Sequence, residues 1–118
     1  QVTVVEIDSD VIGLVEKPMR EYLGKLSSKL VIIESDICDY VPGDLRFDAI
    51  WLDIWPTLDP FDLPEHKRLT EAFRKYQNPG CFAGCWGAEF LTEICKDLAV
   101  ELGVSEDRIG YAIQELSR

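Results

Sequence analysis

Four acidic residues are placed where they could do chemistry, because each lies at or just past the end of an apolar, β-branched segment. Glu6 and Asp8 close segment 2–7, Asp36 follows segment 30–34, and Asp53 closes segment 47–53. A carboxylate just past a strand can accept hydrogen bonds from the vicinal hydroxyls of a ribose, and an Asp after the neighbouring strand can accept one from an exocyclic amine. Acids are common in loops and caps, so one alone would mean little. Three successive strand ends predict an edge that binds a nucleoside, with Glu6 and Asp36 as its ligands.

Strands must alternate with helices to bring these acids to one edge. The apolar segments 2–7, 30–34 and 47–53 are expected to be strands, and 81–86 a fourth. Apolar residues spaced three and four apart predict helices that begin at Asp8 or Ser9, at Asp62 and at Ala88. Strands separated by helices indicate a parallel sheet covered on both faces, an α/β fold in a single domain over residues 1–118.

Several details of these helices can be predicted. Pro18 should kink the first helix or begin a second one, and the helix from Asp62 should run to about Gln77 and stop at residues 78–80. The helix over Ala88–Leu102 should carry its apolar stripe on Phe90, Leu91, Ile94, Leu98 and Leu102. A last helix, capped by Ser105, should bury Ile109, Ala112, Ile113 and Leu116.

Composition narrows the classes of function. The 118 residues hold 22 acidic and 12 basic side chains, a formal net charge of −10, which disfavours a nucleic-acid partner. The apolar runs are too short to cross a membrane, and no export signal is visible, so we expect a cytoplasmic protein. The four cysteines form no C-x-x-C pair, which predicts buried, reduced thiols and no metal site.

Three motifs resemble a known family. They are V-V-E-I-D-x-D-V-I over residues 4–12, E-S-D-I-x-D-Y-V-P over 34–42 and F-D-A-I-W-L-D over 47–53. Together they resemble the central part of class I S-adenosylmethionine-dependent methyltransferases, and the first motif is most similar to spermidine synthases, the aminopropyltransferases. The resemblance covers residues 2–60 well and 61–102 in element order. It implies a Rossmann-like, three-layer α/β/α fold with a mainly parallel sheet, truncated at its N-terminus.

The resemblance also implies roles for five residues. Glu6 matches the acid that binds the ribose hydroxyls of the cofactor, and Ile7 the residue beside the adenine. Asp36 matches the Asp that contacts the adenine amine, and Ile37 supplies backbone contact. Asp53 matches a catalytic acid near the methionine portion, which in aminopropyltransferases helps to hold or deprotonate the attacking amine. The implied cofactor is S-adenosylmethionine or its decarboxylated form, and the partner is a small-molecule acceptor such as an amine.

The sequence departs from the family's pattern at several points, two of which bear on the cofactor and on the polyamine assignment. The family's first strand and Gly-rich loop would precede Gln1, so we expect these 118 residues to bind S-adenosylmethionine weakly or not at all. Where spermidine synthases carry a second Asp, this chain has Pro56, and its nearest Asp-Pro pair is Asp59-Pro60. The absent strand would leave edges on the strands ending at Glu6 and Asp53. These two strands could pair directly or a second copy could supply a strand, and of the two we expect the homodimer.

Other functions remain open on the sequence. In a response-regulator receiver domain Asp53 would be the phosphoacceptor and Glu6 and Asp8 would hold Mg²⁺, although residues 81–87 offer no hydroxyl and no Lys-Pro follows a later strand. A dinucleotide-binding dehydrogenase would use Glu6 for ribose, but the chain has no G-x-G-x-x-G. A third possibility is a non-catalytic remnant of the methyltransferase fold.

The aromatic residues and the single histidine are expected to be structural. The three tryptophans should pack in or beside the core, with Trp55 of most interest because it lies two residues past Asp53. His66, followed by Lys67 and Arg68, is expected on a solvated helix face.

Overall fold

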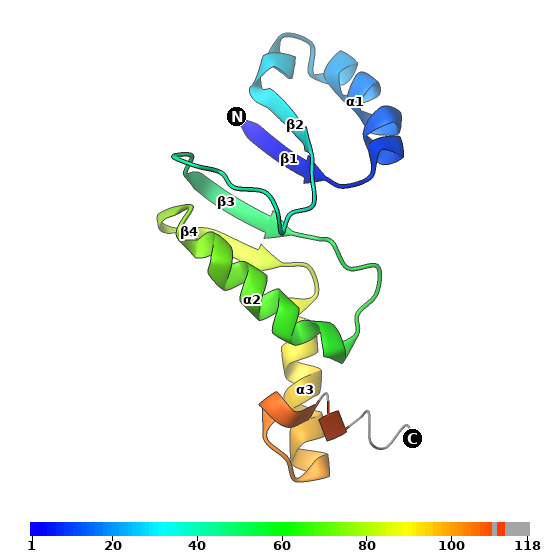
Figure 1. Ribbon diagram of the computed structural model, residues 1–118, viewed down its shortest axis with the longest axis vertical. Coiled ribbons are helices and arrows are strands. Elements are labelled where there is room, and N and C mark those ends of the chain that lie inside the picture. Colours follow the sequence, from blue (N-terminus) through cyan, green and yellow to red (C-terminus); the bar gives the residue numbers. More distant parts are fainter. Residues whose placement is uncertain (110, 113–118) are drawn as a thin grey trace. The chain divides into compact units, whose positions relative to one another are not determined.

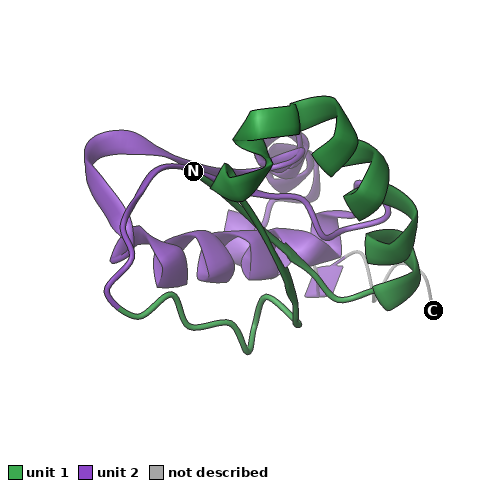
Figure 2. Ribbon diagram, turned by 90° about the horizontal axis from the view of Figure 1, so that it is seen from above, with its two compact units in different colours: residues 1–43 green, residues 44–118 purple. Residues whose placement is uncertain are grey.

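The chain divides into two compact units in a computed structural model that describes residues 1–109, 111 and 112. The first unit spans residues 1–43 and the second spans 44–118, as coloured in Figure 2. Each unit contains a parallel pair of strands, so the described chain is a mixed α/β protein with two two-stranded sheets (Figure 1).

The first unit is a β-α-β arrangement. Strand β1 (Val2–Glu6) leads into helix α1 (Ser9–Leu23), the 3₁₀ helix η1 (Gly24–Lys29) and strand β2 (Leu30–Glu34). The two strands pair in parallel from Val2 opposite Leu30 to Glu6 opposite Glu34. Strand β1 therefore ends at Glu6, one residue before its predicted end, and Ile7 lies just past it.

Helix α1 begins at the predicted place. Asp8 is its N-cap, with the side-chain Oδ1 accepting from the backbone N–H of Asp10 at 2.8 Å and of Val11 at 3.4 Å. Pro18 lies inside a helix that continues to Leu23, so the predicted start of a second helix there is wrong. A proline removes only the hydrogen bond of its own nitrogen, and the capped first turns and the turns after it still hold the helix.

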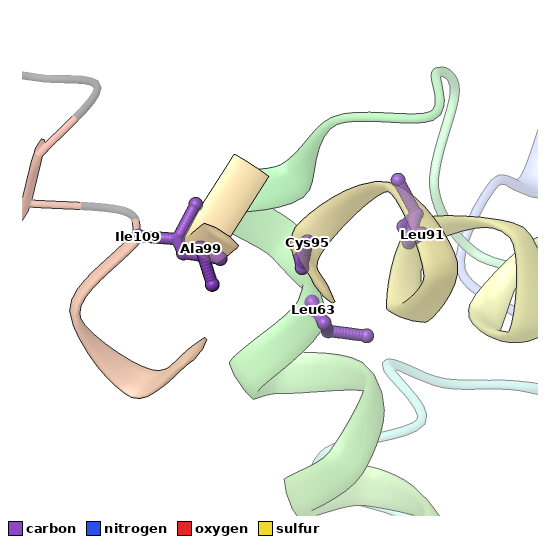
Figure 3. Packing of buried hydrophobic residues seen from close by; sticks show 5 residues of the cluster. All are labelled: Leu63, Leu91, Cys95, Ala99 and Ile109. Atoms are coloured by element: carbon purple, nitrogen blue, oxygen red, sulfur yellow. The ribbon is translucent and has the colours of Figure 1, made fainter. Parts of the chain in front are cut away.

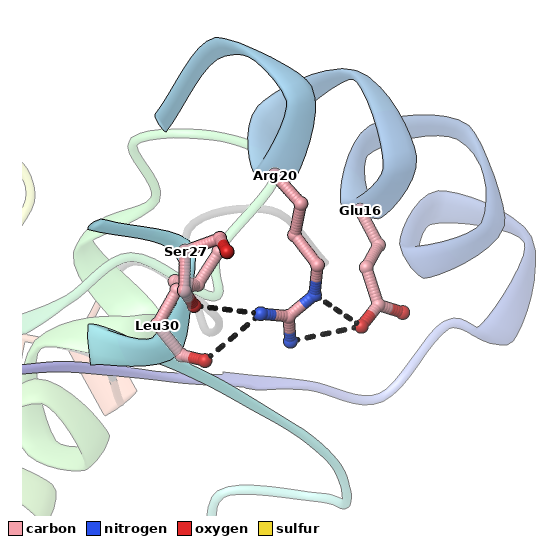
Figure 4. A network of polar contacts seen from close by, with 4 residues as sticks. All are labelled: Glu16, Arg20, Ser27 and Leu30. Atoms are coloured by element: carbon pink, nitrogen blue, oxygen red, sulfur yellow. Dashed lines mark hydrogen bonds and ion pairs between the residues drawn. The ribbon is translucent and has the colours of Figure 1, made fainter. Parts of the chain in front are cut away.

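A polar network holds α1 to the end of η1 and the start of β2 (Figure 4). Arg20 bonds Glu16 Oε1 through Nε at 3.0 Å and Nη2 at 3.0 Å. Its Nη1 donates to the carbonyl oxygens of Ser27 at 2.9 Å and Leu30 at 3.2 Å. One half-buried guanidinium therefore satisfies two backbone acceptors where the chain turns from helix to strand.

The second unit begins with β3 (Phe47–Leu52) and continues through η2 (Pro60–Asp62), α2 (Leu63–Arg74), β4 (Gln77–Cys85), α3 (Ala88–Leu102) and η3 (Glu106–Arg108). Helix α2 thus ends before Gln77, and β4 begins four residues earlier than predicted. The Asn-Pro-Gly segment that predicts a helix stop is instead built into the strand.

An irregularity in β4 accommodates these turn residues. Phe47 pairs with Gln77 and Ala49 with Phe82, so residues 78–81 face the single Asp48. Asn78 Nδ2 donates to Asp48 Oδ1 at 2.8 Å, and Gln77 Nε2 donates to the carbonyl of Cys81. Gly80 supplies the left-handed backbone conformation, with φ of 77°. Side-chain hydrogen bonds thus replace the ladder across the bulge.

The core of the second unit lies between α2, α3 and the segment after η3 (Figure 3). Its buried members are Leu63, Leu91, Cys95, Ala99 and Ile109. Leu91, Cys95 and Ala99 follow one another at intervals of four, whereas Phe90 is 56% exposed, so its predicted place on the buried stripe is wrong. Leu63 and Ile109 pack on the side of α3 that carries Leu91, Cys95 and Ala99. The buried stripe of α3 therefore begins at Leu91, one residue later than the hydropathy pattern predicts.

The end of the described chain matches the prediction in part. Ser105 precedes the 3₁₀ turn Glu106–Arg108 without a side-chain cap hydrogen bond, and Ile109 is buried. Ala112 is half-buried, and Ile113 and Leu116, the remaining predicted core residues, lie outside the described residues. Among the helices that the structure describes, none combines the length and the apolar character needed to cross a membrane.

Candidate functional site

The structure brings Glu6 and Asp36 to one edge of the first unit. Glu6 is the last residue of β1, and Asp36 comes two residues after the end of β2. The backbone N–H of Ser35 donates to the carbonyl of Glu6 at 3.0 Å, which holds the two strand ends together past the ladder. The parallel register therefore produces the predicted pair of acids at the carboxyl ends of neighbouring strands.

Each of the two carboxylates is oriented by a backbone N–H close to it in sequence. Glu6 Oε1 accepts from the N–H of Asp8 at 2.9 Å, and Asp36 Oδ1 accepts from the N–H of Cys38 at 2.8 Å. The carbonyl of Asp36 also accepts from the N–H of Tyr40 at 3.1 Å, which closes the turn. These bonds use one oxygen of each carboxylate, and the second oxygen of a carboxylate can accept from a ligand.

Apolar side chains accompany these acids. Ile7, directly after Glu6, is 65% exposed, and Ile37, directly after Asp36, is half-buried. Exposed aliphatic surface beside paired hydrogen-bond acceptors suits a ligand with a flat apolar ring and polar edges, such as a purine nucleoside. Asp8, in contrast, uses its carboxylate to cap α1 and is a structural residue.

Asp53 belongs to the second unit and is exposed. It follows Leu52, whose carbonyl accepts from the N–H of Trp86 at 2.8 Å and so ties the end of β3 to the residue after β4. Asp53 is thus at the carboxyl end of its own parallel sheet, one residue past the strand. Asp53 therefore belongs to a different unit from Glu6 and Asp36.

The segment after Asp53 is anchored by an unexpected aromatic pair. Trp55 is 7% exposed, and its ring stacks on that of His66 in α2, with centroids 3.5 Å apart and an interplanar angle of 30°. The indole Nε1–H donates to Glu65 Oε2 at 3.1 Å. His66 is only 1% exposed, so its expected place on a solvated helix face is wrong.

A positional signal could have found His66. It lies three residues from Leu63, three from Leu69 and seven from Phe73, all of them buried residues of α2. Lys67 and Arg68, the neighbours that suggested solvent, are exposed. Helical spacing was therefore a better guide to this histidine than the charge of its neighbours.

The electrostatics of His66 follow from its burial. Burial lowers the pKa of the imidazole below its ordinary value, and the nearby carboxylates of Asp62 and Glu65 oppose this shift without cancelling it. Neither ring nitrogen has a hydrogen-bond partner in the described structure. The ring is thus held neutral by packing rather than by a proton acceptor.

A cavity of about 820 Å³ lies beside α2, β4 and the start of α3 in the second unit. Thr70 and Cys85 line it and bond to each other through Oγ1 and Sγ at 2.9 Å. Burial raises the pKa of the Cys85 thiol, with the Thr70 hydrogen bond acting in the other direction, so this thiol stays protonated and unreactive.

The four cysteines differ in burial. Cys85 and Cys95 are buried free thiols, as expected, but Cys38 is exposed and Cys81 is half-buried, so burial of all four is wrong. Across residues 1–109, 111 and 112, no three His, Cys, Asp or Glu side chains come close enough together to hold a metal ion.

Comparison of the chain with protein-family models, with curated proteins and with solved structures finds no match.

Proposed function

We propose that this chain binds the nucleoside of S-adenosylmethionine, or of its decarboxylated form, and takes part in alkyl transfer to a small acceptor such as an amine. The observation that carries the proposal is the Glu6–Asp36 edge. The carboxylates of Glu6 and Asp36 are each oriented by a hydrogen bond to one oxygen, and the other oxygen can accept from a ligand. They lie at the carboxyl ends of two paired parallel strands, beside exposed aliphatic surface. This is an arrangement that suits ribose hydroxyls and an exocyclic amine.

The strand pairing supports a Rossmann-like methyltransferase fold as the parent architecture. In that sheet β1 would pair with β2 and β3 with β4, all in parallel, with one further strand between β1 and β3. Both expected pairs are present in the described chain, each within its own unit. Each pair also has an acid at the carboxyl end of its leading strand, Glu6 in one and Asp53 in the other.

In the proposed reaction, binding of the donor and proton transfer are carried out by different residues. A bound sulfonium donor supplies an electrophilic carbon. Glu6, Ile7, Asp36 and Ile37 bind and orient the nucleoside, which sets the direction of that carbon. Asp53, exposed and one residue past β3, accepts the proton of an amine nucleophile on a carboxylate oxygen.

Glu6→Gln is expected to weaken nucleoside binding. In ¹⁵N-labelled protein, S-adenosylhomocysteine should shift the amide signals of Glu6, Ile7 and Ile37. The substitution should raise the dissociation constant roughly 5- to 150-fold, because a charge-assisted hydrogen bond worth about 1–3 kcal/mol is lost. Titration followed by NMR suits the weak binding expected of this chain.

Glu34→Gln is the matched control. Glu34 stands opposite Glu6 in the ladder and is exposed, and its replacement removes the same charge from the same edge. We expect little change in affinity. Equal losses in both variants would mean that charge alone attracts the ligand, and unchanged affinity in Glu6→Gln would contradict the assignment.

We expect the chain to self-associate through its strand edges. Two-stranded sheets are marginal in water, and β1 and β3 each pair with one strand only in the described chain. The bulge and Pro79 make β4 a poor partner for a strand of a second copy. Strand β1 contains neither a bulge nor a proline, so its edge can pair. Light scattering at micromolar concentration should give about twice the 13.4 kDa chain mass, and a monodisperse monomer would contradict dimerisation.

A further inference from the structure

The segment that begins at Asp53 is attached to the rest of the second unit at three points. Trp55 stacks on His66, and Asp59 Oδ1 accepts from the N–H of Phe61 at 2.9 Å to cap η2. Leu58 lies against Gly87, where an added Cβ would come within 2.1 Å of Leu58 Cδ2. Of these attachments, only the Trp55 stack is nearly sealed from solvent and contains a group that titrates near neutrality.

His66 is the single histidine of the chain, and the titratable groups around it belong to η2, α2, β4 and α3. Asp62 approaches it from the end of η2 and Glu65 from α2 itself. On β4, Cys85 Sγ lies 3.5 Å from the His66 carbonyl oxygen, and on α3 Glu89 lines the same cavity. Glu65 is engaged with the indole of Trp55, so the imidazole nitrogens have no partner among these groups.

We propose that His66 is a positioning residue for Asp53: the neutral ring clamps Trp55 and so fixes the segment 53–58, and protonation of the ring releases it. The inference rests on the proposed function only in giving Asp53 a chemical role. The clamp itself rests on the stack, the sealed ring and its unpartnered nitrogens.

The proton balance explains the release. Neutral imidazole carries one N–H, and uptake of a proton from solvent on its other nitrogen gives an imidazolium with two donors. In the closed stack neither donor has an acceptor, and the charge is cut off from water. Attraction between a cation and the indole face, together with the carboxylates of Asp62 and Glu65, opposes release. Burial outweighs both carboxylates, since the pKa of His66 is lowered in their presence.

The direction with pH follows from this shift. A histidine whose pKa is lowered in the closed state binds protons better once the ring is solvated, so acidification favours opening. Opening begins as the pH falls below the ordinary histidine pKa of about 6.5 and proceeds toward the lower pKa of the closed state. Above that range the clamp stays closed.

The first experiment follows Trp55 directly. In a variant carrying Trp51→Phe and Trp86→Phe, Trp55 is the single tryptophan, and its emission should move to longer wavelength between pH 7 and pH 5 while the far-UV circular dichroism stays constant. Should that variant not fold, the indole N–H signals of ¹⁵N-labelled wild-type protein report the same event, because Trp55 donates to Glu65. Loss of the circular dichroism at the same midpoint would overturn a local clamp.

The second experiment assigns the event to His66. Its Hε1 signal should titrate with a midpoint below the ordinary value, and the backbone amides of residues 54–58 should shift with that same midpoint. His66→Phe keeps a stacking ring that cannot titrate, so both pH responses should vanish. A midpoint at or above the ordinary value, or an emission change that persists in His66→Phe, would overturn the proposal. None of these measurements needs a cofactor, so their failure is distinct from failure of S-adenosylhomocysteine binding.

Discussion

Replacing Leu91 by Ala should lower the free energy of unfolding of the second unit by about 2–5 kcal/mol. Leu91 is 0% exposed and belongs to the cluster in which α3 meets Leu63 of α2. Truncation removes apolar contacts and leaves a cavity, and a rigid helix pair cannot close over it completely.

Urea unfolding followed by tryptophan emission measures this effect, because all three tryptophans belong to the second unit. Phe90→Ala is the matched control, as Phe90 precedes Leu91 on α3 but is 56% exposed. We expect it to cost well under half as much. Equal losses at the two positions would show that the stripe of α3 is placed wrongly.

Trp55→Ala should cost about 3–5 kcal/mol in the same unit. The indole is almost completely buried, stacks on His66 and donates a hydrogen bond to Glu65. Its loss exposes the sealed face of α2 and removes the main attachment of the segment after Asp53.

Trp51→Ala serves as its control. Trp51 lies four residues earlier and is 57% exposed, with its ring 6.0 Å from that of Phe82. Surface aromatic pairs contribute about 0.5–1.5 kcal/mol, so its urea midpoint should fall much less than that of Trp55→Ala. A larger loss at Trp51 than at Trp55 would contradict the structure around α2.

Local sequence patterns predicted those elements whose signals are complete within a few residues. Helix α3 runs over Ala88–Leu102 as predicted, because an apolar period and a terminal glycine, Gly103, fix both its body and its end. Strand β2 is also at the predicted residues. The pairing of β1 with β2 places Glu6 and Asp36 at neighbouring strand ends, and their role as nucleoside ligands stays a prediction.

Features that depend on distant partners were missed. The bulge in β4 is stabilised by Asp48, which is 30 residues away from Asn78, so a turn-rich segment could join a strand. The helical spacing of His66 indicates a buried position, but no local pattern encodes its stacking contact with Trp55. The joining of Asp53 to the nucleoside edge stays a prediction, as does the three-layer sheet.

The first unit has few completely buried apolar side chains, and this affects how tightly it could bind a ligand. Its only buried large hydrophobic residue is Leu30, while Arg20 ties the helix to the strand through charge-assisted bonds. We expect a module with so little completely buried apolar surface to open at a lower free-energy cost than a well-packed one, so a ligand at its edge must offset the conformational entropy of ordering it. Affinity there would be limited by the disorder that binding removes, and a ligand that did bind would also act as a folding agent for β1 and β2.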